Sequence, residues 1–130
     1  MTKEEKQLLL KDLCTRLPYG VKLRYVEDLV VKKESHIITL NNIYLEHILN
    51  GDADIKPYLR PMSSMTEEEM KEFQAFHCVD GLHPYFYQQM CNLQNLENMF
   101  NWLNAHYFDY RRLIEKGLAL EAPEDMYKNE

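Results

Sequence analysis

Residues 13–26 read Leu-Cys-Thr-Arg-Leu-Pro-Tyr-Gly-Val-Lys-Leu-Arg-Tyr-Val, and the pattern of apolar residues changes within this stretch. Before it, leucines recur at helical spacing, whereas after it apolar and charged residues alternate as in a half-buried strand. Proline cannot continue a helical hydrogen-bond ladder and glycine accepts left-handed angles, so Pro18 and Gly20 mark a boundary. A helix over residues 2–17 followed by a sheet region over residues 18–62 predicts an α+β fold.

Strands are expected over residues 21–26, 29–32 and 36–40, because these segments are rich in β-branched and aromatic side chains. They would pair as an antiparallel meander, with residues 33–35 as one of its turns. The sequence therefore predicts a small antiparallel sheet that bends toward a barrel, and an SH3-like curl of this sheet is a second arrangement that the pattern allows.

The end of the sheet region is less uniform in pattern. Residues 43–50 fit a short helix about as well as a strand, and the pattern leaves both open. Residues 54–61 contain two prolines, which remove ladder donors and favour extended backbone, so this stretch is expected to be an edge segment.

Two or three helices are predicted in the helical region over residues 63–120. Thr66 and Glu69 have the spacing of a capping box, and a later stripe of Leu96, Phe100 and Leu103 marks a second helix. A last short helix would run from an Asp109 cap to residue 116. Residues 77–92 carry no readable pattern, and the acidic tail over residues 121–130 is expected to be loose.

Length, charge and cysteine content describe the class of protein. The chain has 130 residues, the size of a single domain, with 45% hydrophobic and 28% charged residues. No apolar run is long enough for a membrane span, and three cysteines at irregular spacing suggest reduced thiols in a cytoplasmic protein. The second half is acidic, with five Lys and Arg against twelve Asp and Glu after residue 65. This charge disfavours binding to nucleic acid or to anionic membranes.

Three segments of the chain, residues 13–22, 56–66 and 106–119, resemble small uncharacterised proteins of gut Bacteroidetes and their mobile elements. The resemblance covers the two ends and the middle junction, while residues 26–54 and 76–98 differ more freely. It implies an intracellular bacterial setting and brings no activity, cofactor or catalytic residue with it.

The best metal candidate is a group of four side chains around a segment without a clear pattern: His77, Cys78, His83 and Cys91. Structural zinc sites generally place ligands in pairs two to four residues apart, and this group lacks such pairs. No metal and no cofactor are therefore predicted. Only four glycines are present, and no two are close enough to form a phosphate-binding loop.

A nucleophilic site would need a thiol, a base and an orienting carboxylate. The candidates are Cys14 or Cys78 as the thiol, His77, His83 or His106 as the base, and Asp80 or Asp109 as the carboxylate. Neither thiol lies in a nucleophile-elbow pattern, so no catalytic residue is predicted. Free cysteine is more often a small buried apolar residue.

Aromatic residues are frequent in the last third of the chain, and most of them should be core. Trp102 lies off the apolar stripe of its helix, and arginines follow the aromatic residues after it. Aromatic and arginine side chains are enriched at protein interfaces. The expected partner-binding residues are Trp102, Tyr107, Tyr110, Arg111 and Arg112. An anion or carboxylate site using Arg111 or Arg112 is an alternative for the same cluster.

The leading hypothesis is a non-enzymatic, cytoplasmic interaction module that binds a protein partner or itself. The first alternative is a small hydrolase or metal-dependent enzyme that uses the His77 to Cys91 region. The second is a weak nucleic-acid binder with a basic patch of Lys22, Arg24, Lys32 and Lys33.

Overall fold

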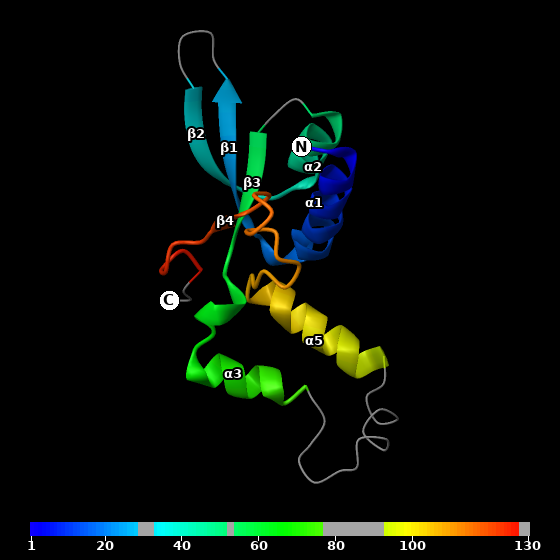
Figure 1. Ribbon diagram of the computed structural model, residues 1–130, viewed down its shortest axis with the longest axis vertical. Coiled ribbons are helices and arrows are strands. Elements are labelled where there is room, and N and C mark those ends of the chain that lie inside the picture. Colours follow the sequence, from blue (N-terminus) through cyan, green and yellow to red (C-terminus); the bar gives the residue numbers. More distant parts are fainter. Residues whose placement is uncertain (29–32, 52–53, 77–92, 128–130) are drawn as a thin grey trace.

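The computed structural model describes residues 1–28, 33–51, 54–76 and 93–127, and these form a mixed α+β fold (Figure 1). The predicted fold class, with its N-terminal helix, small sheet and later helices, is confirmed. The α-helices and strands follow in the order α1 (Lys3–Arg16), β1 (Lys22–Asp28), β2 (Lys33–Thr39), α2 (Asn42–Asn50), β3 (Asp54–Leu59), α3 (Glu67–Gln74), α5 (Leu93–Ala105) and β4 (Leu120–Glu121). Short 3-10 turns occupy Leu17–Tyr19 and Met62–Ser64.

Helix α1 forms as the sequence predicts. Thr2 accepts a hydrogen bond from the backbone of Glu5, and the Glu5 carboxylate accepts one from the backbone of Thr2. These hydrogen bonds lower the pKa of Glu5. At the other end, Gly20 has a φ of 69°, which glycine adopts without steric cost.

The sheet has the strand order β2-β1-β3-β4. β1 pairs antiparallel with β2 and with β3, whereas β4 pairs parallel with β3, so the sheet is mixed rather than wholly antiparallel. The expected edge position of residues 54–61 is wrong, since β3 lies between two neighbours. Its pairing passes from β1 to β4 after Pro57. The missing N–H of proline thus lies where the strand exchanges one partner for the other.

The expected turn at residues 33–35 is also wrong. These residues belong to β2, whose register with β1 runs from Lys22 opposite Thr39 to Asp28 opposite Lys33. The seven register pairs extend the ladder between β1 and β2 past the segment expected to turn. The expected strand at residues 29–32 lies outside the described residues.

The core lies between the sheet and helices α1 and α2, which cover the same face of the sheet (Figure 1). Leu9 and Leu13 of α1 and Leu23 of β1 are completely buried there. Residues 43–50, which the sequence left open, are helical. Asn41 caps α2 by accepting hydrogen bonds from the backbone of Ile43 and Tyr44.

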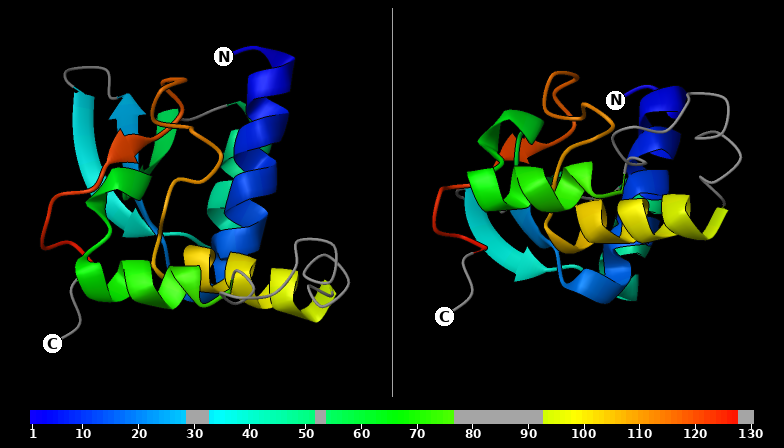
Figure 2. Two further views of the ribbon diagram at one scale, coloured as in Figure 1. Left: turned by 60° about the horizontal axis from the view of Figure 1, so that its bottom comes forward. Right: turned by 90° about the horizontal axis from the view of Figure 1, so that it is seen from below.

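Helices α3 and α5 lie side by side below the sheet (Figure 2). The predicted capping box of α3 is present, with Thr66 accepting from the backbone of Glu69 and Glu69 accepting from that of Thr66. No residue of α3 is buried, whereas Leu103 and Asn104 of α5 are.

The expected helix after Asp109 is wrong, because residues 110–117 form turns. Asp109 nevertheless caps backbone amides, accepting from Leu113 at 2.8 Å and from Ile114 at 3.0 Å. Leu113 and Leu118 reach into the core from these turns. Burying both leucines needs an irregular path around the end of the sheet, and this outweighs the local helix signal.

The tail is not loose as far as Tyr127. The Tyr127 hydroxyl donates to the carbonyl of Tyr58 and accepts from the backbone N–H of Lys22. Its ring stacks on Tyr107 with 3.7 Å between centroids. Burial raises the pKa of Tyr127 above its ordinary value of 10.0. The side chain of Tyr127 thus joins β1, β3 and the loop that carries Tyr107.

Candidate functional site

The most unusual feature of the molecule is a buried ion pair on the inner side of α1. Asp12 and Arg16 are completely buried, and the Arg16 guanidinium donates to the Asp12 carboxylate from Nε at 2.7 Å and from Nη2 at 3.1 Å. Burying two charges is costly unless both are well hydrogen-bonded. The two side chains therefore need further polar partners in the interior, and these partners define the site.

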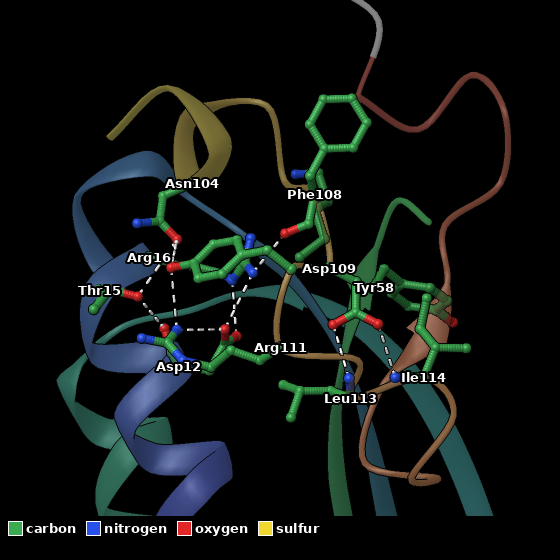
Figure 3. A network of polar contacts seen from close by, with 12 residues as sticks. Asp12, Thr15, Arg16, Tyr58, Asn104, Phe108, Asp109, Arg111, Leu113 and Ile114 are labelled. Carbon is green, nitrogen blue, oxygen red and sulfur yellow. Dashed lines mark hydrogen bonds and ion pairs between the residues drawn. The ribbon is translucent and has the colours of Figure 1, made fainter. Parts of the chain in front are cut away.

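A second arginine reaches the same carboxylate from a distant part of the chain (Figure 3). Arg111 Nη1 donates to Asp12 Oδ1 at 2.8 Å, and Arg16 Nη2 donates to the carbonyl of Phe108 at 2.7 Å. We call Asp12, Arg16 and Arg111 the arginine cluster. It joins α1 to the segment that follows α5, although the two are separated by about ninety positions.

Tyr110 lies at the centre of this arrangement. Its hydroxyl donates to Asn104 Oδ1 at 2.8 Å and accepts from Arg111 at 3.1 Å. The guanidinium carbons of Arg16 and Arg111 lie 5.2 Å and 4.9 Å from its ring centroid, within range of cation–π attraction. Tyr110 thus holds both arginines in place.

The arginine cluster carries two positive charges and one negative charge. Arg16 Nη1 is buried and has no hydrogen-bond partner among the contacts of the described residues. The nearby carboxylate of Asp109 points away, toward the backbone amides of Leu113 and Ile114 (Figure 3). The site thus has an excess of positive charge.

Sequence reasoning missed Asp12 and Arg16, although the signal is present. Both fall at helical spacing with Leu9 and Leu13, on the stripe that the sequence assigns to the core. A charged pair four residues apart on an apolar stripe indicates a buried ion pair. The third member, Arg111, was predicted to be functional but for a surface site.

Trp102 is not the centre of an exposed face. Its indole N–H donates to Glu72 Oε2 at 2.9 Å, and its ring packs against Phe73, Phe76 and Phe108. Its ring also contacts that of His106, with 4.2 Å between centroids and a tilt of 30° between the planes. Trp102 therefore holds α3 against α5, and its position off the apolar stripe reflects this second helix.

Tyr107 makes two contacts within the molecule. Its hydroxyl donates to the carbonyl of Tyr19, and its ring stacks on Tyr127. Burial raises its pKa. Its φ is 64°, and Arg112 has a φ of 60°. Of the five expected partner-binding residues, Arg112 alone is exposed.

Among the α5 side chains that the structure describes, the large apolar ones that are exposed are Leu96 and Phe100, each 43% exposed. They continue the stripe of the buried Leu103, and the Phe100 ring contacts Tyr110 with 5.4 Å between centroids. We call Leu96, Phe100 and Tyr110 the α5 face. The structure brings Tyr110 and Arg111 together beside this face, and it places Trp102 and Tyr107 elsewhere.

The described candidates for a thiol-based site, Cys14, His106 and Asp109, each have separate surroundings in the structure. Cys14 is exposed on α1, His106 Nδ1 lies 2.9 Å from the Trp102 carbonyl, and both carboxylate oxygens of Asp109 accept from backbone amides. Cys78, Asp80 and the metal candidates His77, His83 and Cys91 lie outside the described residues. Within the described part of the chain, no group of three or more His, Cys, Asp and Glu side chains could hold a metal ion.

The structure describes the side chains of two residues of the basic patch, Lys22 and Arg24. Lys22 and Arg24 occupy the sheet face opposite the core, and Arg24 Nη2 lies 3.7 Å from Asp54 Oδ2. Lys56 is the register partner of Arg24 on β3. Lys32 lies outside the described residues, as does the side chain of Lys33.

No family model, no curated protein and no solved structure matches this chain. Among the helices that the structure describes, none has the length and apolar character needed to cross a membrane.

Proposed function

We propose that this protein is a non-enzymatic interaction module that binds a protein partner through the α5 face. The observation that carries the proposal is the exposure of Leu96 and Phe100 on a stripe whose next member, Leu103, is only 2% exposed. An apolar stripe normally faces a neighbouring element along its length. Here the outer half of α5 has apolar side chains in position for a neighbour that another chain would supply.

The surroundings of the α5 face also support this role. Tyr110 contacts Phe100 on one side and is held by Asn104 and Arg111 on the other. Aromatic anchors that are already held in place lose little conformational entropy on binding. Tyrosine and arginine are also among the residues that contribute most binding energy at interfaces.

The test is a quantitative affinity capture from host lysate with three baits: the unchanged chain, Phe100→Ser and Asn101→Ser. Asn101 lies on α5 and is exposed, so it is a matched control on another side of the same helix. We expect a protein that the unchanged chain and Asn101→Ser retain equally and that Phe100→Ser loses. Equal capture by all three baits would contradict the α5 face as the binding site.

Self-association is measured separately, by light scattering of the purified chain over a range of concentrations. A dimer that Phe100→Ser dissociates would identify a second copy as the partner. Trp102→Ala is unsuitable for either test, because it would remove the contacts between α3 and α5.

A further inference from the structure

We propose that the partner carries a carboxylate next to an apolar side chain, and that Arg111 binds this carboxylate while the α5 face takes the apolar group. The inference rests on the proposed function and names the chemistry of the partner at the same site. It comes from the charge balance of the arginine cluster, which lies directly beside Phe100 and Tyr110.

The first step is the unequal number of charges. Arg16 and Arg111 both bond Asp12, and among the contacts of the described residues neither arginine bonds another carboxylate. A positive charge in a poorly solvated position attracts an anion more strongly than an exposed charge does. A carboxylate arriving at this site would restore the balance.

The second step is accessibility. Arg16 is completely buried, whereas the Arg111 side chain is 20% exposed. Guanidinium has five N–H donors, and in the described structure Arg111 has hydrogen-bond partners at Nη1 alone. Because Asp12 and the Tyr110 ring fix the guanidinium, its remaining donors are oriented in advance for a carboxylate.

The third step is orientation along the α5 face. Phe100 contacts Tyr110, whose ring lies against the Arg111 guanidinium, while Leu96 lies one helical turn earlier on α5. The positive charge of Arg111 therefore lies at the Phe100 end of the face. The acidic charge of the second half of the chain acts over longer distances and is screened within about 8 Å at physiological salt. We expect the partner carboxylate at the Tyr110 end.

The test uses the full chain as bait for a displayed library of short random peptides. We expect selected peptides to combine Asp, Glu or a free C-terminus with an aromatic or aliphatic residue. One selected peptide and its amide counterpart, with Asn or Gln for the acid, are then measured by fluorescence anisotropy. Binding should weaken about tenfold for Arg111→Gln and for the amide peptide, with little further loss when both are combined.

Arg112→Gln is the matched control, because it removes the same charge at the next position, where the side chain is exposed. It should leave binding unchanged. Arg111→Lys keeps the charge beside Asp12 but loses the planar fork of the guanidinium, so it should also weaken binding. It replaces Arg111→Gln in the test if that variant fails to fold.

Two results would overturn the inference in different ways. Peptides that require Phe100 but show no acidic preference, or bind Arg111→Gln and Arg111→Lys normally, would refute the carboxylate site and leave the proposed function standing. Peptides that are indifferent to Phe100→Ser, or no selected peptides at all, would refute the α5 face itself.

Discussion

The molecule has two halves, one formed by α1, α2 and the sheet and the other by α3 and α5. Each half is stabilised by a different set of contacts. The first half has a continuous core in which Leu9, Leu13 and Leu23 are completely buried. The second half has no buried residue in α3 and combines the ring packing of Trp102 with directed contacts, such as the Trp102 indole with Glu72 and the Arg60 guanidinium with Glu69. Apolar burial tolerates small shifts, whereas single directed contacts are lost outright when one group is changed.

The arginine cluster lies where the two halves meet. Asp12 and Arg16 belong to α1, while Arg111 and the Phe108 carbonyl follow directly after α5. Stability at this junction therefore depends on polar groups that share partners, so that removing Asp12 leaves both arginines without their carboxylate. This difference between core, junction and helical pair leads to three predictions.

Removing the shared carboxylate should have the largest effect. Asp12→Ala leaves the buried guanidinium of Arg16 and the partly exposed one of Arg111 without their counter-charge, and we expect a loss of about 4 kcal/mol in the free energy of unfolding. Urea unfolding followed by circular dichroism measures it. Lys11→Ala, at the exposed neighbouring position, is the control and should change stability little. A loss below about 1 kcal/mol for Asp12→Ala would contradict a buried cluster.

A cavity in the core should have the next largest effect. Leu13→Ala removes a completely buried side chain, and we expect a loss of about 3 kcal/mol. Because the sheet half supports the helical pair, circular dichroism and Trp102 fluorescence should report the same shifted transition. Leu49→Ala, at a side chain that is 58% exposed, is the control. If the unfolding transition seen by Trp102 fluorescence were the same in Leu13→Ala as in the unchanged chain, α3 and α5 would fold independently of the core.

The smallest effect should be confined to the helical pair. Arg60 donates two hydrogen bonds to Glu69, and these lower the pKa of Glu69 from 4.5 to about 2. Since the folded pKa lies below the ordinary value, this stabilisation is complete above pH 4.5 and is lost as the pH falls toward 2. Glu69→Gln should cost about 1 kcal/mol at neutral pH, after allowance for solvent screening.

Trp102 fluorescence follows this change, since Trp102 is the only tryptophan and contacts α3. The unchanged chain should show a shift between pH 4.5 and 2 that is smaller in Glu69→Gln. Glu67→Gln, at an exposed residue of the same helical turn, should keep the full shift. An identical pH response in the unchanged chain and Glu69→Gln would mean that Arg60 and Glu69 do not hold α3.

The sequence was most informative where the physical cause is local. The capping box of Thr66 and Glu69 was predicted residue by residue, because it joins a side chain and a backbone group three positions apart. The same holds for Gly20, which has a φ of 69° at the boundary that the sequence marks. By contrast, the interior place of β3 depends on β4, which lies about sixty positions later, and no local pattern signals that pairing.

The candidate site shows the same division. The aromatic and arginine content of residues 102–112 marks the segment in which Tyr110 and Arg111 lie. Trp102 lies off the apolar stripe of its own helix because α3 contacts it from another direction. Arg111 contacts Asp12 across 99 positions, a distance over which helical periodicity carries no information.

The hydroxyl of Tyr127 bonds a backbone group of β1 that precedes it by 105 positions. During synthesis on the ribosome, β1 and β2 can pair before Tyr127 has been made, whereas the carbonyl of Tyr58 and the amide of Lys22 gain their shared partner only afterwards. Chain synthesis therefore puts these two steps in order, with the pairing of β1 and β2 ahead of the contact that joins β1 to β3 through one hydroxyl.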